Sequence, residues 1–202
     1  MQAILTALGF LFAGAGAVLA ECPTAKDVDG PGVVVEFKDN WSTIYSRTPS
    51  GTLLEVSKAG GDDDYFLESE KGIHVIAEGP WKDGEPVSDQ IIRFSVPGGV
   101  TLPEPTTNMS WSVEYDVLNP DGSRQKSTTR INSGGTAEMT IGGCKYEVIP
   151  MHFVFKPAND AGTISALSYV RELGILVLTA SGEMGGVYSL FFTPIGIKRV
   201  GE

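Results

Sequence analysis

The chain has 202 residues, 25 acidic and 15 basic side chains and a formal net charge of −10. This charge argues against nucleic acid and anionic lipid surfaces as partners, because an acidic surface repels phosphate groups. None of it falls on the first twenty residues, which are mainly Ala, Leu, Gly, Phe, Ile and Val and end in Val18-Leu19-Ala20. A small-residue ending after an apolar stretch is typical of signal peptidase cleavage. We therefore predict a signal peptide over residues 1–20 and a periplasmic or secreted mature protein.

An uncleaved anchor is the alternative for this segment, since about 20 apolar residues can span a bilayer. After cleavage, we expect no stable membrane span. Residues 21–202 are enough for one β-rich domain with its own core, with a possible internal boundary at residues 97–107, where three prolines occur.

The two cysteines, Cys22 and Cys144, are expected to form a disulfide, because an even number of cysteines in an oxidising compartment favours a bridge. The bridge would close a loop of about 120 residues and stabilise the fold by about 4 to 5 kcal/mol on the chain-entropy view.

The apolar residues of the mature chain recur with a period of two, which is typical of strands with one buried face. The clearest case covers residues 109–118, where Trp111, Val113, Tyr115 and Val117 alternate with polar residues. It is followed by an Asn-Pro-Asp-Gly turn signal over residues 119–122 and by a second strand, so a hairpin is predicted. In chain order, the predicted strands cover residues 33–37, 43–47, 53–58, 65–69, 74–78, 91–96, 109–118, 125–131, 137–141, 146–155, 164–169 with 173–180, and 187–193.

Such short strands separated by Gly, Pro and Asn turn signals predict an all-β antiparallel meander, forming a curved sheet, a half-barrel, a barrel or a sandwich. Pro150 cannot donate to a strand ladder, so it indicates an edge or a bulge at which the buried face changes from Tyr146 and Val148 to Met151. Residues 173–180 and 187–193 are apolar on both faces, so both of these strands are expected to be covered on both sides.

Residues 143–148 (Gly-Cys-Lys-Tyr-Glu-Val) and 168–177 (Ser-Tyr-Val-Arg-Glu-Leu-Gly-Ile-Leu-Val) are similar to the closing hairpins of bacterial periplasmic β-proteins. Some of those proteins resemble curved half-barrels that carry lipoproteins or lipids in the envelope. The resemblance implies a concave apolar surface. The chain departs from that pattern because it has no clear lid helices, and the resemblance supplies no catalytic residues.

The residues that could perform chemistry are few and scattered. His74 and His152 both lie inside predicted strands, where a lone histidine is usually structural. Glu68 and Glu70 share a strand face and could act as paired carboxylates of a hydrolase, although a solvent-facing strand surface explains them better. Asp62, Asp63 and Asp64 are weak candidates for a calcium ligand set, although their spacing fits no known loop and a solvated hairpin tip explains them better.

Trp81 follows Gly79-Pro80 in a turn-like stretch and is a weak candidate for a ligand or partner surface. No cofactor and no catalytic residue is expected. The sequence favours a non-enzymatic exported domain that binds an envelope protein or a hydrophobic ligand, and the alternatives are a periplasmic lipid or hydrophobic-ligand carrier and a carboxylate-dependent hydrolase. An enclosed apolar cavity would indicate a carrier, and a perturbed carboxyl or histidine in a cleft with a second polar group would indicate an enzyme.

Overall fold

A computed structural model describes residues 21–59, 64–98, 100–158 and 161–202, so the predicted signal peptide lies outside the described residues. The fold is all-β, as predicted, apart from one α-helical turn and one 3-10 turn. Its elements are α1 (Ala25–Val28), β1 (Val33–Phe37), β2 (Ser42–Arg47), β3 (Leu53–Lys58), β4 (Tyr65–Glu70), β5 (His74–Lys82), β6 (Glu85–Pro86), the 3-10 turn (Ser88–Gln90), β7 (Ile92–Ser95), β8 (Ser110–Leu118), β9 (Arg124–Ser133), β10 (Ala137–Ile141), β11 (Cys144–Pro157), β12 (Thr163–Val170), β13 (Ile175–Glu183), β14 (Leu190–Phe191) and β15 (Pro194–Arg199).

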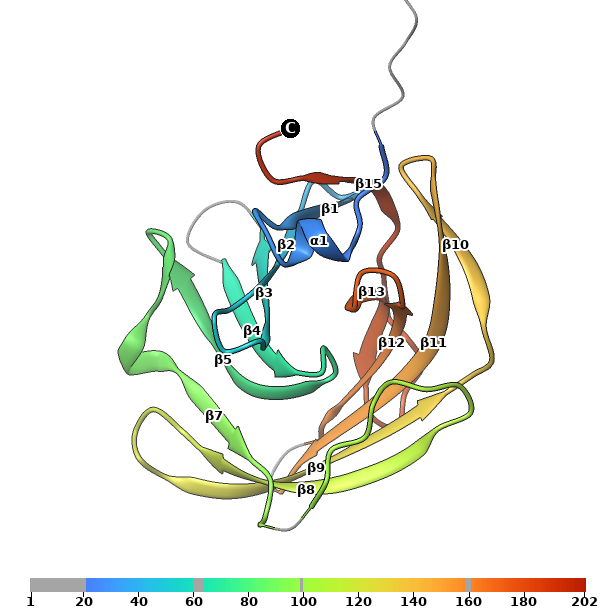
Figure 1. Ribbon diagram of the computed structural model, residues 1–202. Coiled ribbons are helices and arrows are strands. Elements are labelled where there is room, and N and C mark those ends of the chain that lie inside the picture. The colour runs from blue at the N-terminus through green and yellow to red at the C-terminus, as the bar shows by residue number, and fades with distance from the viewer. Residues whose placement is uncertain (1–20, 60–63, 99, 159–160) are drawn as a thin grey trace, which may run out of the picture.

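The strands form one antiparallel sheet in the order β14-β13-β12-β11-β9-β8-β7-β5-β4-β3-β2-β1-β15, with β10 paired to β11 and β6 paired to β5. The sheet bends round on itself, so that the first and last strands approach each other (Figure 1). Its two ends, β14 and β15, belong to one stretch of chain, residues 190–199, which pairs first with β13 and then with β1. The sheet is therefore curved and is not closed by a ladder between its edges.

The strands on either side of residues 97–107, β7 and β8, pair with each other, so the sheet continues past this stretch. Residues 102 and 103 of the connection contact the β4–β5 turn. There, Lys71 Nζ donates to the Leu102 carbonyl at 2.9 Å, and His74 Nε2 donates to the Pro103 carbonyl at 2.9 Å. The connection is thus fastened to the sheet by polar contacts to its backbone.

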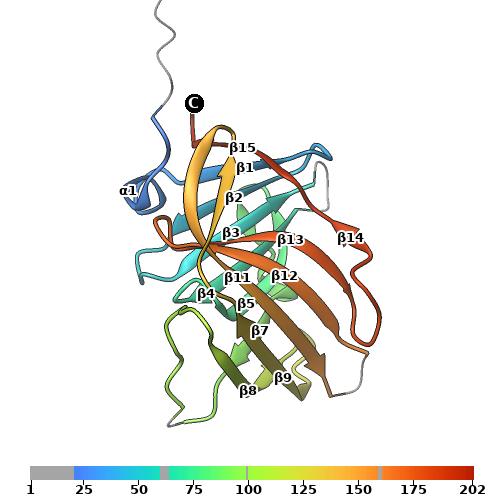
Figure 2. The ribbon, with the colours of Figure 1, turned by 90° about the vertical axis from the view of Figure 1, so that its right-hand side faces the viewer.

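The largest core cluster lies on the concave face at the end of the sheet where α1, β1 and β15 meet (Figures 1 and 2). Its fully buried side chains include Val33, Tyr45 and Ile175 from strands that are far apart in the sequence. The Tyr45 hydroxyl crosses from β2 to β13 and donates to the Leu176 carbonyl at 2.7 Å. Burial raises the pKa of this phenol well above its usual value. This contact holds the two arms of the curved sheet together.

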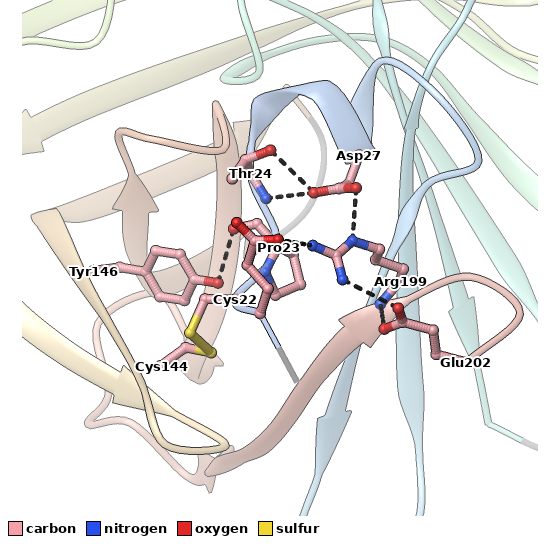
Figure 3. Close-up of polar contacts among 9 residues, drawn as sticks. Cys22, Pro23, Thr24, Asp27, Cys144, Tyr146, Arg199 and Glu202 are labelled. Atoms are coloured by element: carbon pink, nitrogen blue, oxygen red, sulfur yellow. Dashed lines mark hydrogen bonds and ion pairs between the residues drawn. A yellow bond between two sulfur atoms is a disulfide. The ribbon is translucent and has the colours of Figure 1, made fainter. Parts of the chain in front are cut away.

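The N-terminal segment is attached to this end of the molecule by three kinds of contact (Figure 3). The predicted disulfide is present between Cys22 and Cys144, with a Cα–Cα distance of 5.6 Å. The Tyr146 hydroxyl donates to the Pro23 carbonyl at 3.1 Å, and Arg199 Nε pairs with Asp27 at 2.8 Å. The Thr24 backbone N–H and the Arg199 guanidinium lower the pKa of Asp27 by donating to its charged form. The disulfide therefore ties residues 21–28 to β11, while the ion pair ties them to β15.

The buried face of β11 changes at Pro150, as predicted. The even-numbered residues Cys144, Tyr146 and Val148 are buried before this point, and the odd-numbered residues from Ile149 onward are buried or partly buried after it. Pro150 itself is exposed, and its carbonyl accepts the Gly134 N–H at 2.8 Å. The change lets one long strand contribute to the cluster near α1 and then to the wall of a separate cavity.

The convex face carries a smaller core over β3, β4 and β5, built from Val56, Phe66 and Ala77. Each of them is the neighbour, on its own strand, of one of the paired residues Glu55, Leu67 and Glu78, so it points to the opposite face of the sheet. The chain between β5 and β7 folds over them, and the Val87 N–H donates to the Pro80 carbonyl at 3.0 Å. The sheet is therefore covered on both faces in this region.

The expectation for the two C-terminal strands is confirmed for the first and wrong for the second. In β13, Ile175, Leu176 and Val177 are consecutive and all buried. In residues 187–193, by contrast, Val187 is 83% exposed and Phe191 is 70% exposed. Only Leu190 and Phe191 of this stretch form a strand, which pairs with the edge of β13 before the chain crosses to β1. Among the described residues, no helix has the length and apolar character needed to cross a bilayer.

Candidate functional site

A cavity of about 460 Å³ lies on the concave face beyond the main core. It is lined by residues from nine strands and from the β4–β5 turn, so residues from both arms of the curved sheet surround it. Most of the lining is apolar, and several wall residues, such as Leu67 and Phe153, keep part of their surface accessible because they face this space. A volume of this size is typical of sites for small organic ligands.

One wall of the cavity contains a row of three residues on neighbouring strands. Glu55 of β3 is opposite Leu67 of β4, and Leu67 is opposite Glu78 of β5. Directly paired residues of an antiparallel sheet share a face, and all three side chains line the cavity. Neighbouring strands are about 4.8 Å apart, so the two glutamates lie about 10 Å apart across the wall, with Leu67 between them.

Glu55 is the most strongly perturbed group of this wall. Burial among apolar neighbours raises its pKa from 4.5 to about 8, because a carboxylate loses its hydration there. Within the described part of the chain, no hydrogen bond or ion pair is formed by its side chain. The accessible part of this residue faces the cavity. The raised pKa favours the protonated form of Glu55 at pH 7, and its carboxyl group faces the cavity without a protein partner among the described residues.

Glu78 is buried less completely and has one polar neighbour. Burial raises the pKa of its carboxyl, and the nearby phenol of Tyr65 opposes part of this rise. Tyr65 is 37% exposed, so Glu78 is placed between the interior and a partly exposed aromatic ring. Both glutamates are shifted in the same direction, and burial is the main cause for each of them.

Aromatic side chains contribute another part of the lining. Phe94 of β7 contacts Tyr115 of β8 and Phe155 of β11 edge to face, with ring centroids 6.2 Å and 6.1 Å apart. Burial raises the pKa of Tyr115 to about 12, so its hydroxyl stays protonated. Glu55, Glu78 and Tyr115 are the titratable residues of the lining, and no Lys, Arg or His is among the described residues that line it.

Trp81 does not lie in this cavity. It packs partly buried on the convex-face cluster, with its ring centroid 6.1 Å from that of Phe66. The Gly-Pro sequence before it indicated a loop, but residues 74–82 form one strand, so Trp81 covers a core edge. The structure therefore gives its indole a packing role.

The histidines and the glutamates of β4 considered as catalytic groups also lie outside the lining. His74 is buried against Trp111 and donates from Nε2 to a carbonyl, and burial lowers the pKa of its ring. His152 contacts the Tyr188 hydroxyl, and Glu68 accepts from the Thr52 hydroxyl on the opposite face of β4. The structure brings none of them together with Glu55 or Glu78.

The calcium hypothesis cannot be placed fully, because Asp62 and Asp63 lie outside the described residues. Asp64 is described and pairs with Lys58 at 2.6 Å. Over the described ranges, no group of three or more His, Cys, Asp or Glu side chains is arranged to hold a metal ion.

Glu55 and Glu78 were missed by sequence reasoning. Both are single acidic residues inside otherwise apolar strand segments, Leu53-Leu54-Glu55-Val56 and Val75-Ile76-Ala77-Glu78. A strand whose two faces are both covered has no solvated side for a carboxyl group. A lone acidic residue in an apolar strand could therefore have indicated these two positions. Using it, however, required knowing that both faces of β3 and β5 are covered.

Comparison of the chain with protein-family models, curated proteins and solved structures gave no match. The resemblance of residues 143–148 and 168–177 to periplasmic β-proteins therefore stays a prediction. The function has to be inferred from the chain's own residues.

Proposed function

We propose that the mature protein is an exported, non-enzymatic binding protein that holds a small hydrophobic molecule in the concave cavity. The observation that carries this proposal is the apolar cavity of about 460 Å³ between the arms of the sheet. A well-filled sheet would have no place for a ligand, whereas apolar walls around a cavity of this size favour burial of a small apolar body.

Export is part of this proposal, with a periplasmic or extracellular location. It is supported by the apolar segment 1–20 with its small-residue ending and by the Cys22–Cys144 disulfide. A carrier that works in an aqueous compartment outside the cytoplasm has to shield its ligand from water, and the curved sheet offers an interior for this purpose.

A carboxylate-dependent hydrolase is the second candidate, because Glu55 has a perturbed pKa and shares the cavity with Glu78. Acid–base catalysis by two carboxyls, however, uses environments that push their pKa values apart, so that one is an acid while the other is ionised. Here burial raises the pKa of both, and the described lining contains no basic side chain that would hold either of them ionised. The geometry therefore favours binding over hydrolysis.

The test is binding of N-phenyl-1-naphthylamine, an uncharged dye that becomes fluorescent in apolar surroundings, to the oxidised mature protein. Leu67 lies between Glu55 and Glu78 on the wall, a set that we call the glutamate row. Leu67→Trp therefore fills the cavity from the centre of this row and should weaken dye binding by about tenfold or more. Phe191→Ser is the matched control, because it removes an exposed apolar side chain elsewhere and should leave binding unchanged. Equal binding to the wild type and to a folded Leu67→Trp variant, or loss of binding in Phe191→Ser alone, would place the dye outside the cavity and overturn the proposal.

A further inference from the structure

Two glutamates in the wall of the cavity lower the stability of the fold, and a site that binds only an apolar molecule does not need them. An unsatisfied carboxyl group in apolar surroundings destabilises the fold, because it loses hydrogen bonds to water without replacement. Glu55 is partly accessible in the cavity and has no hydrogen-bond partner among the described residues, whereas Leu or Met would fit an apolar wall without placing a polar group there. The carboxyl groups are therefore best explained by a polar group that arrives with the ligand.

We propose that the ligand is a lipophilic amine, whose ammonium group lies between Glu55 and Glu78 while its apolar part occupies the aromatic end of the cavity. This inference rests on the proposed function and adds the chemical class of the ligand. The geometry that carries it is the placement of two glutamates on one wall, with their backbones about 10 Å apart on either side of Leu67, in a cavity whose described lining contains no basic side chain.

The titratable groups that face this wall from the other elements favour a cationic ligand over an anionic one. Tyr45 of β2 lies close enough to feel the charge of Glu55, but its hydroxyl is already used on the Leu176 carbonyl. Tyr65 lies near Glu78 and lowers the pKa of its carboxyl, and Tyr115 contributes a neutral phenol from β8. An anionic ligand, such as a fatty acid, would find no cation here and would face two acidic groups. A protonated amine can donate to both.

Aromatic rings suit the apolar part of such a ligand. Phe94, Tyr115 and Phe155 line the same cavity. Apolar groups of a ligand pack favourably against such aromatic rings. An amine with an apolar chain or ring system can therefore satisfy the carboxyl groups and the aromatic lining together.

Binding of such a ligand changes the protonation of Glu55. In the empty cavity, burial raises the pKa of this carboxyl to about 8, which favours its protonated form at pH 7. When the ammonium group binds, the Glu55 proton leaves to solvent and the carboxylate pairs with the ammonium, so that one proton is released for each ligand bound. Affinity should then rise with pH between about 6 and 8, for as long as the amine itself stays protonated.

The experiment compares decylamine, decanol and decanoate, which share one chain, as competitors of N-phenyl-1-naphthylamine. Decylamine should displace the dye about tenfold better than decanol, and decanoate should be the weakest. This preference should disappear in the double variant Glu55→Gln, Glu78→Gln and persist in Glu68→Gln, which changes the opposite face of β4. Calorimetry in two buffers with different protonation enthalpies should show about one proton released with decylamine and none with decanol.

The outcomes separate the two proposals. Equal displacement by the three competitors, or strongest displacement by decanoate or decanol, would leave the carrier proposal standing and overturn the amine. Failure of the dye to bind the cavity, judged by Leu67→Trp, would instead overturn the carrier proposal. A thermal melt of each variant confirms that it is folded, and Glu55→Gln alone, which keeps the shape of the side chain, provides a second test if the double variant does not fold.

Discussion

Replacing Glu55 by Gln should change how the stability of the protein depends on pH. The unfolded chain ionises this carboxyl near pH 4.5, whereas in the fold burial holds its pKa at about 8. Between these values the unfolded state releases a proton that the folded state keeps, so the free energy of unfolding falls as the pH rises. The stability present below pH 4.5 is therefore lost progressively up to about pH 8.

The magnitude follows from the same two values. Each pH unit between them corresponds to about 1.4 kcal/mol, so the whole window amounts to about 5 kcal/mol. Between pH 5 and pH 8, the wild type should lose about 3 kcal/mol relative to Glu55→Gln. Glu78 acts in the same direction and remains in both proteins. Asp27, whose pKa is lowered, affects stability only at more acidic pH and does not enter this window.

The assay is urea unfolding of the oxidised mature protein at pH 5, 6, 7 and 8, followed by tryptophan fluorescence. Glu85→Gln is the control, since this residue is exposed on the short strand β6 and its replacement should leave the wild-type pH profile unchanged. The constant cost of burying the Gln amide shifts the Glu55→Gln curve as a whole, so only the change in the difference with pH is informative. Parallel curves for the wild type and Glu55→Gln would refute the argument that Glu55 is buried and neutral.

Three further predictions concern the scaffold, each measured by urea unfolding at pH 7. The double variant Cys22→Ala, Cys144→Ala should lose about 4 to 5 kcal/mol, because the bridge spans 122 residues; a loss below about 1 kcal/mol would contradict this. Gly72→Ala should cost more than about 2 kcal/mol, since its Cβ would lie 2.7 Å from a backbone oxygen at positive φ. Gly51→Ala, at a similar φ in open space, should cost about 1 kcal/mol, and equal costs would show that the contact is relieved. Ser127→Ala should be neutral or stabilising by about 1 kcal/mol, because its buried hydroxyl has no partner within the described structure, and a clear loss would reveal one.

Most strands could be predicted because their residues follow a period of two that turn residues interrupt. The ranges 33–37, 53–58 and 137–141 coincide with β1, β3 and β10. By contrast, β15 was not predicted, since it begins at Pro194 and contains Gly196. Local propensity argues against a strand there. Its pairing with β1 is a long-range contact that the local pattern does not encode.

The disulfide was predictable for a different reason. With two cysteines and a predicted signal peptide, only one intramolecular pairing exists, so counting was sufficient. The role of Trp81 was not predictable in this way, because it depends on the chain between β5 and β7 folding over the convex face. The exposure of residues 187–193 likewise depends on where the segment crosses from β13 to β1.

The cavity escaped sequence reasoning because its polar positions look like a solvent-facing strand surface. On β9, Ser127 and Thr129 alternate with Lys126, Thr128 and Arg130, so both faces appear wet in the sequence. In the structure, however, Thr129 lines the cavity and Ser127 is buried, while the charged residues point outward.

Small hydroxyl side chains at inward positions have a physical consequence. Thr129, Thr163 and Ser165 are too short to fill the space between the arms of the sheet, so a void remains where larger apolar residues would have closed the core. A sheet that curves round such residues acquires a cavity without any helix to cover it. Substituting Ser165→Leu should therefore reduce dye binding as Leu67→Trp does, but with a gain in stability, since it extends the apolar core into the void. A folded Ser165→Leu protein that binds dye as the wild type does would show that the hydroxyl side chains do not define the cavity.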